Sequence, residues 1–174
     1  MEKSKANLAD IQMLVLDVDG VLTDGTLVIN EDGGESKFFC SLDGHGIRMW
    51  QRAGLKVAFL SGRQSASVRH RAEQLEVEYV FQNCLDKLDA LKKFLEQIGL
   101  SADKVVYVGD DLPDLPVMRY VGFGAAVANA VDEVKRYADY VTLRKGGDGA
   151  VREVIEYILK STGRWDELMK KYLS

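Results

Sequence analysis

The chain has 174 residues, of which 47% are hydrophobic and 29% are charged, a composition typical of soluble globular proteins and unlike that of disordered ones. Its formal net charge of −4 at pH 7 disfavours general nucleic-acid binding but is compatible with a local basic pocket for a small anion. The length fits a single domain, 1–174, with a sizeable core.

The N-terminal stretch MEKSKANLADIQ lacks the apolar segment of a signal peptide, and no apolar run approaches the roughly 20 residues that span a bilayer. We therefore expect a cytoplasmic protein without a membrane partner. Cys40 and Cys84 lie far apart and lack CxxC spacing. They are predicted to be free thiols, not members of a disulfide or a zinc site.

Taken in chain order, four short apolar runs predict buried strands of a parallel sheet, and helical patterns separate them. The strands are MLVL (13–16), VAFL (57–60), YVF (79–81) and VVYV (105–108). Helices are predicted at 43–53 and 85–98, where apolar residues recur at helical spacing and Gly54 and Gly99 follow as helix ends. This alternation predicts a doubly wound, Rossmann-like α/β fold, whose ligands bind beyond the carboxyl ends of the strands.

The segment 26–39, TLVINEDGGESKFF, interrupts this alternation after the first strand. Two β-like runs flank Asp32-Gly33-Gly34, so the segment is predicted to form a β-hairpin, inserted and too small to be a domain. The C-terminal tail, 164–174, carries apolar side chains at helical spacing. It is predicted to dock either on its own core or on a neighbouring subunit.

Three of the predicted strands end in polar or charged residues that could take part in catalysis or ligand binding. Parallel neighbouring strands bring such ends together, and carboxylates packed that closely require a compensating cation. Mg²⁺ suits a site of one or two carboxylates and a substrate phosphate. The alternative is that Asp17, Asp19 and Asp24 only form turns or helix caps. The three strand ends are Asp17-Val18-Asp19, Ser61-Gly62-Arg63 and Gly109-Asp110-Asp111.

Four motifs, in this order, resemble those of the haloacid dehalogenase-like phosphatases: DVDGV (17–21), LSGR (60–63), Lys87 and GDDLPD (109–114). The resemblance covers about residues 12–160 and implies hydrolysis of phosphomonoesters through an aspartyl-phosphate. It makes Asp17 the nucleophile and Asp19 the general acid and base, roles that carboxylates can perform. It also implies that Ser61 hydrogen-bonds the phosphoryl oxygens and that Lys87 neutralises the nucleophile and the phosphate.

The same resemblance implies a Mg²⁺ ion held by Asp17, the backbone carbonyl of Asp19 and Asp110. Asp111 or Asp114 would support the metal, although Asp114, one helical turn beyond Asp110, is alternatively a cap. Asp24 is predicted to belong to the turn that begins the hairpin.

The motifs leave no room for a large cap domain, because 24–43 holds only the hairpin and 63–86 only one helix and one strand. With DGHGI (43–47) and GGDGAVRE (146–153), the chain resembles the capless subgroup that hydrolyses 3-deoxy-D-manno-octulosonate 8-phosphate (Kdo 8-phosphate) in lipopolysaccharide precursor synthesis. This resemblance implies a homotetramer in which the hairpins pack together and neighbouring subunits cover the active sites.

Substrate contacts are predicted at two kinds of position. Arg63 and Arg71 suit bidentate hydrogen bonds to the carboxylate of a sugar acid. The stretches 44–46 and 146–149 are predicted to be loops whose backbone approaches sugar hydroxyls, with a polar contact from His45. The candidate contacts there are Gly44, His45, Gly46 and Gly147.

Three alternatives stay open. One is a phosphatase of a nine-carbon 2-keto-3-deoxy sugar acid 9-phosphate, although such relatives tend to carry glutamate where Arg63 follows the glycine of LSGR. Another is a non-catalytic oligomerising domain of the same fold, against which the four intact motifs argue. The third is a phosphate-accepting receiver domain, which would place its acidic pair before the acceptor aspartate.

Overall fold

The apolar runs of the sequence form the centre of one sheet. The computed structural model describes residues 7–173; residues 1–6, part of the stretch without a signal-peptide pattern, and Ser174 of the tail lie outside the described part. β1 (Met13–Leu16) is buried along its whole length and pairs in parallel with β4 on one side and β6 on the other. The side chains of this strand therefore contact the helices on both faces of the sheet.

Six parallel strands follow the order β5-β4-β1-β6-β7-β8. The strand order changes direction at β1, so the end of β1 lies at the switch point where ligands of such sheets bind. The four predicted strands and the doubly wound α/β fold are confirmed. After β1, the strands are β4 (Lys56–Leu60), β5 (Tyr79–Phe81), β6 (Val105–Gly109), β7 (Phe123–Ala126) and β8 (Tyr140–Val141).

The sequence patterns do not predict β7 and β8. β7 consists of Phe-Gly-Ala-Ala and lacks a run of large apolar residues, and β8 has only two residues. A side chain at Gly124 would meet the side chain of Met118 in α4, with a Cβ–Cβ distance of 3.2 Å. The small residues of β7 thus allow a helix to approach the sheet closely.

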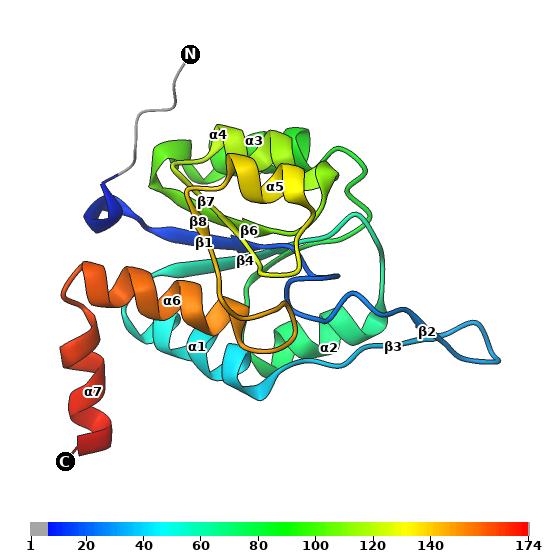
Figure 1. Ribbon diagram of the computed structural model, residues 1–174, viewed down its shortest axis with the longest axis horizontal. Coiled ribbons are helices and arrows are strands. Elements are labelled where there is room, and N and C mark those ends of the chain that lie inside the picture. The colour runs from blue at the N-terminus through cyan, green and yellow to red at the C-terminus, as the bar shows by residue number, and fades with distance from the viewer. Residues whose placement is uncertain (1–6, 174) are drawn as a thin grey trace.

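Helices cover both faces of the sheet. α1, α2 and α6 lie on one face and α3, α4 and α5 on the other, with α7 projecting beyond the end of α6 (Figure 1). Within residues 7–173, none of the helices is both long and apolar enough to cross a membrane. The α-helices are α1 (Ser41–Arg52), α2 (Ala66–Gln74), α3 (Lys87–Ile98), α4 (Leu115–Tyr120), α5 (Asp132–Tyr137), α6 (Ala150–Ser161) and α7 (Trp165–Leu173).

Both predicted helices form, with ends that differ by about two residues. α3 begins at Lys87 because the side chain of Asp86 accepts a hydrogen bond from the backbone N–H of Asp89 and caps the helix. Gly99 ends α3 in the left-handed conformation, with φ of 63°, as predicted. Cys40 and Cys84 are free, also as predicted.

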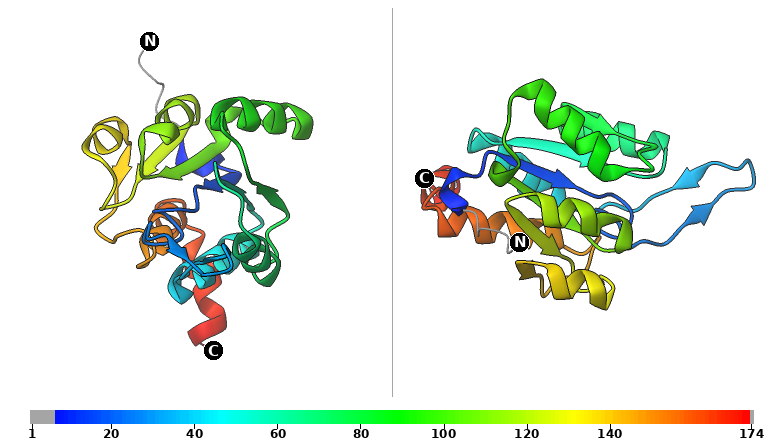
Figure 2. Two further views of the ribbon diagram at one scale, coloured as in Figure 1. Left: turned by 90° about the vertical axis from the view of Figure 1, so that its right-hand side faces the viewer. Right: turned by 90° about the horizontal axis from the view of Figure 1, so that it is seen from above.

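The predicted hairpin is present and extends away from the body of the molecule (Figure 2). Its paired part is short, because only β2 (Val28–Ile29) and β3 (Glu35–Ser36) form an antiparallel ladder. No large cap domain covers the carboxyl end of the sheet within the described residues. The base of the hairpin lies beside the strand ends, and its tip extends beyond them.

The C-terminal tail forms α7 and packs on its own chain at one end. Trp165 contacts the core, with the charged groups of Arg152 and Lys160 over its ring at 5.8 and 4.6 Å. At the other end, the Tyr172 hydroxyl accepts a hydrogen bond from Arg52 in α1, whereas Leu173 is 79% exposed. Docking of α7 on a neighbouring subunit stays a prediction.

Candidate active site

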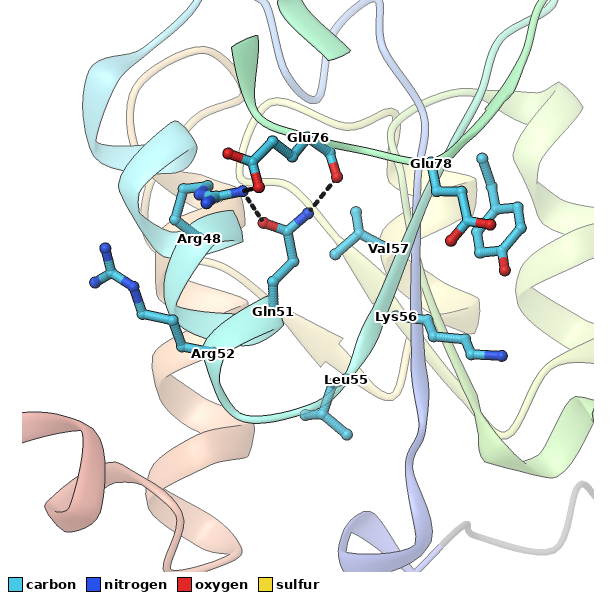
Figure 3. Close-up of a pocket in the computed structure, with 9 residues that line it drawn as sticks. Arg48, Gln51, Arg52, Leu55, Lys56, Val57, Glu76 and Glu78 are labelled. Carbon is cyan, nitrogen blue, oxygen red and sulfur yellow. Dashed lines mark hydrogen bonds and ion pairs between the residues drawn. The ribbon is translucent and has the colours of Figure 1, made fainter. Parts of the chain in front are cut away.

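The surface has hollows at both ends of the sheet, and their chemistry differs. A hollow of about 390 Å³ near the amino ends of β4 and β5 is lined by charged, polar and apolar residues, some of which interact with one another (Figure 3). There Arg48 forms an ion pair with Glu76 at 2.8 Å, and the side-chain amide of Gln51 donates to the Glu76 carbonyl. Arg48, Gln51 and Glu76 thus hold one another, and the strand ends that carry the predicted chemistry lie at the other end of the sheet.

The hollow beyond the carboxyl ends of β1, β4 and β6 has a volume of about 460 Å³, and we call it the cleft. All three predicted strand ends line it. The structure therefore brings together residues that lie up to 97 positions apart in the chain. The polar side chains that line it are Asp17, Asp19, Ser61, Arg63, Cys84, Lys87, Asp110, Asp111 and Asp114.

Lys87 lies between two buried carboxylates. Its Nζ is 2.7 Å from Oδ1 of Asp17, which follows β1, and 2.7 Å from Oδ1 of Asp114. Burial lowers the pKa of Lys87, but the two carboxylates raise it by more, so the net shift is upward and the ammonium stays charged. The first residue of α3 thus provides a positive charge at the proposed nucleophile.

Asp114 uses both of its carboxylate oxygens within the protein. Oδ1 accepts hydrogen bonds from Lys87 and, at 2.6 Å, from the hydroxyl of Tyr107 in β6. Oδ2 accepts from the backbone N–H groups of Asp110 and Asp111, at 2.9 and 3.2 Å. Asp114 also completes the capping box of the 3₁₀ helix η3 (Leu112–Asp114). The cap that the sequence left as an alternative is therefore present.

Negative charge accumulates around this lysine. Carboxylate oxygens of Asp17, Asp110 and Asp114 all lie within 4.8 Å of one another. Burial, followed by the Asp114 carboxylate, raises the pKa of Asp17 well above its ordinary value, although Lys87 opposes the shift. Burial and Asp114 likewise raise the pKa of Asp110 to about 7. One ammonium does not balance three carboxylates, so a further cation in the cleft would stabilise their ionised forms.

The residues present fit a hard divalent cation. Because the oxygens of Asp114 already accept four hydrogen bonds, Asp17 and Asp110 are the better candidates for ligands. Gly20, with φ of 92°, allows Asp110 to approach the turn after β1, since a Cβ there would lie 2.0 Å from Asp110 Oδ2. Asp111 is exposed and caps η3 through Leu112 N–H, which takes it out of the acidic cluster.

Three further side chains at the cleft could contact an anion or a leaving group. Ser61 is buried, and its Oγ accepts a hydrogen bond from the backbone N–H of Arg63 at 3.1 Å, which leaves the hydroxyl proton to donate. The Asp19 carboxylate forms an ion pair with Lys37. The guanidinium of Arg63 pairs with Glu35.

Comparison with known proteins agrees with this geometry. Residues 79–155 match the model of the haloacid dehalogenase-like hydrolases. The 3-deoxy-D-manno-octulosonate 8-phosphate phosphatase KdsC of Escherichia coli K12 is 42% identical over 93% of this chain and 86% of its own length. The chain belongs to the haloacid dehalogenase-like hydrolases.

Solved structures of the family resemble this one over most of their length. The Kdo 8-phosphate phosphatase of Moraxella catarrhalis, in complex with magnesium ion, phosphate ion and Kdo, is 38% identical, with a TM-score of 0.92 and 95% of each chain covered. The cobalt-bound enzyme of Haemophilus influenzae is 40% identical, with a TM-score of 0.87 and coverage of 90% of this chain and 91% of that one. The family resemblance inferred from the four motifs is confirmed.

Gly44, His45 and Gly46 lie within α1, so the prediction that this stretch forms a loop is wrong, whereas contact of these residues with the substrate stays a prediction. A Cβ at Gly44 would lie 2.3 Å from a guanidinium nitrogen of Arg71, and one at Gly46 2.9 Å from Cδ of Arg152 in α6. The glycines thus allow close packing of α1 within this haloacid dehalogenase-like hydrolase. His45 contacts the Tyr172 hydroxyl of α7 at 3.0 Å.

The late glycines also pack against backbone. A Cβ at Gly146 would lie 1.7 Å from the carbonyl oxygen of Gly20, and one at Gly147 2.5 Å from the amide nitrogen of Asp24. The N–H of Gly147 donates to the carbonyl of Val21 at 3.0 Å. This turn therefore supports the backbone that follows the proposed nucleophile, and the sugar contact of Gly147 stays a prediction.

Two other predicted residues have local partners. The guanidinium of Arg71 donates to the carbonyl of Cys40 and lies over the ring of Phe39, so it does not line the cleft of its own chain. Asp24 accepts a hydrogen bond from the N–H of Thr26 at 2.8 Å and belongs to the turn before the hairpin, as predicted.

Sequence reasoning did not identify Glu35, Lys37 or Tyr107 as members of the site. Glu35 and Lys37 lie in the predicted hairpin, where their charges suggest only a solvated strand. Tyr107 belongs to the apolar run of β6 and is fully buried. The only available signal was a hydroxyl inside that run, since a buried tyrosine normally requires a hydrogen-bond partner.

Proposed function

We propose that this chain is a Mg²⁺-dependent phosphatase that hydrolyses Kdo 8-phosphate to Kdo and phosphate. The observation that carries the proposal is the buried Asp17–Lys87–Asp114 arrangement at the end of β1, with Asp19 and Ser61 on the same cleft. The names of the similar proteins from Escherichia coli and Moraxella catarrhalis support the choice of substrate. Synthesis of lipopolysaccharide precursors in the cytoplasm is the setting that we infer for the reaction.

In the proposed reaction, a carboxylate oxygen of Asp17 attacks phosphorus, and the bond from phosphorus to the sugar oxygen breaks. Asp19 donates a proton to the departing oxygen, and then accepts one from the water that hydrolyses the aspartyl-phosphate. Lys87 and the Ser61 hydroxyl contact the phosphoryl oxygens. Mg²⁺, held by Asp17, the carbonyl of Asp19 and Asp110, would neutralise charge on the phosphoryl group.

The substrate carboxylate would bind Arg63 on the cleft wall. The Arg63 side chain is 44% exposed and its guanidinium is paired with Glu35, so an incoming carboxylate would exchange one ion pair for another. This arrangement suits a phosphorylated sugar acid better than a neutral sugar phosphate. The nine-carbon sugar acids share the carboxylate, so they are the substrates to compare.

We also infer that neighbouring subunits of a homotetramer cover the cleft. Leu27 and Leu85 line it and are 49% and 91% exposed. Apolar side chains at the rim of an open active site are typical of a surface that another chain covers. Covering the cleft would exclude water and strengthen the contacts with the phosphate.

The test is phosphate release from Kdo 8-phosphate with Mg²⁺ and with chelator, beside the same assay on a nine-carbon sugar acid 9-phosphate. We expect turnover that requires Mg²⁺ and favours the eight-carbon substrate. Asp17→Asn, which removes the nucleophilic carboxylate and keeps its size, should abolish turnover while the protein stays folded. Folded wild-type protein that releases no phosphate from either substrate would refute the proposal.

A further inference from the structure

Four charged groups connect the hairpin to the cleft. Lys37 directly follows β3, and its side chain is only 3% exposed. Its ammonium contacts Oδ1 of Asp19 and lies 3.4 Å from Oε2 of Glu35. The other oxygen of Glu35 contacts the guanidinium of Arg63. The chain of pairs Asp19–Lys37–Glu35–Arg63 thus joins the ends of β1 and β4 through the base of the hairpin.

This pairing makes the two oxygens of Asp19 different. Oδ1 contacts Lys37, whereas Oδ2 is buried and has no hydrogen-bond partner among the described residues. A buried carboxylate oxygen without a partner is costly, because it has lost its contacts with water. The side chain is 20% exposed and lines the cleft, so a group bound in the cleft could supply the missing partner.

We propose that Lys37 is a positioning residue for the acid–base step of the proposed reaction. By holding Oδ1, its ammonium fixes the Asp19 carboxyl group so that Oδ2 exchanges the proton with the sugar oxygen. Burial of the lysine side chain keeps the ammonium in place, and Glu35 provides a second partner. The inference rests on the proposed function, because it concerns how Asp19 acts on the departing alcohol.

Two simpler roles of Lys37 must be separated by a test from positioning of Asp19. The ion pairs could only close the base of the hairpin, or Lys37 could bind the substrate phosphate. Both of those roles would serve every phosphomonoester alike. A role through Asp19 depends on the leaving group, because a sugar alkoxide needs a proton as the P–O bond breaks, whereas 4-nitrophenolate leaves without one. Acid–base catalysis typically contributes about 10²–10⁴-fold, so the difference is measurable.

The experiment compares kcat/KM of wild type and Lys37→Met for Kdo 8-phosphate and 4-nitrophenyl phosphate, both with Mg²⁺. This ratio covers only the steps up to departure of the alcohol, so hydrolysis of the aspartyl-phosphate does not enter. We expect the substitution to lower kcat/KM for Kdo 8-phosphate at least about tenfold more than for the aryl phosphate. Lys37→Arg should restore most of that difference. Lys93→Met, at an exposed lysine of α3, should leave both values unchanged.

An equal loss with both substrates, or no loss with either, would overturn the role of Lys37. A double-mutant cycle adds a second criterion: in an Asp19→Asn background, Lys37→Met should cause no further loss with Kdo 8-phosphate. If Lys37→Met does not fold, Lys37→Gln removes the charge but keeps a hydrogen-bond donor, and the same comparison applies. Failure of the proposed function is distinguishable, because wild type would then release no phosphate from Kdo 8-phosphate, whatever its activity on the aryl phosphate.

Discussion

Tyr107 lies outside the four motifs, but its hydroxyl belongs to the buried hydrogen-bond network around Asp114. Asp114 connects Lys87 with the backbone that carries Asp110, and the tyrosine hydroxyl shares Oδ1 of Asp114 with the lysine. Because Tyr107 is fully buried, its hydroxyl has no water to replace this acceptor. The position of the lysine therefore depends on a side chain from the core of the sheet.

Tyr107→Phe should lower the free energy of unfolding by about 1–2 kcal/mol, since it removes a hydrogen bond to a charged acceptor and leaves the packing nearly unchanged. Denaturant unfolding measures this difference. Turnover should fall far less than in Asp17→Asn, because Lys87 still contacts both carboxylates. Tyr120→Phe, at a tyrosine that is 41% exposed, is the control and should stay within about 0.5 kcal/mol of wild type. An effect of Tyr107→Phe no larger than this would contradict a network role.

At the scale of elements, Asp43 joins α1 to α6. Its side chain is 1% exposed and accepts hydrogen bonds from the backbone N–H groups of Gly149 and Arg152, at 3.3 and 2.8 Å. It thereby satisfies two donors at the start of α6, where Gly149, the residue before the helix, has no side chain to do so. DGHGI and GGDGAVRE are thus partners in one helix–helix contact.

Burial raises the pKa of Asp43 to about 6, against the effect of the two backbone hydrogen bonds. The folded state therefore holds this proton more tightly than the unfolded chain does. The resulting stabilisation is complete below about pH 4 and is lost as the pH rises through about 6. Between pH 4 and pH 7, we expect the free energy of unfolding of wild type to fall by on the order of 2–3 kcal/mol relative to that of Asp43→Asn. Unfolding of both proteins at the two pH values tests this, and a difference that is constant or grows in favour of wild type would contradict it.

At the scale of the whole molecule, the sequence predicts the centre of the sheet better than its edge. Short runs of mostly large apolar residues mark β1, β4, β5 and β6, but the small residues of β7 carry no such pattern. The four motifs place Asp17 and Lys87 correctly at one cleft, because strand ends follow from topology. Lys37 contacts Asp19 at that cleft only through the tertiary packing of the hairpin, which no local pattern reports.

The glycines of 43–47 explain why the sequence predicts a loop at 44–46, where the structure has part of α1. Gly44 and Gly46 lower the helix propensity of 43–47, and that composition suggests a loop. In the structure, the space above each glycine is filled by an arginine side chain from a neighbouring helix. Packing thus outweighs local propensity, and a residue type that suggests access for a ligand here provides close contact between helices.

The exposed apolar side chains of the hairpin bear on assembly of the whole protein. Phe38 is 71% exposed and Ile29 60%, on a segment that extends away from the body (Figure 1). If hairpins pack together in a homotetramer, a charge at Phe38 must be buried without a partner, which is strongly unfavourable. Phe38→Asp should therefore reduce the mass in solution from that of an oligomer toward that of a monomer, as measured by light scattering. It should also lower kcat/KM, because the cleft loses its cover.

Leu173→Asp is the matched control at the far end of the molecule. Leu173 is 79% exposed at the end of α7, so its substitution should leave the mass unchanged if the hairpin forms the interface. Dissociation by Leu173→Asp alone would instead assign the interface to the C-terminal tail. A wild-type protein that is monomeric and fully active would contradict subunit covering altogether, because the cleft would then work while open to water.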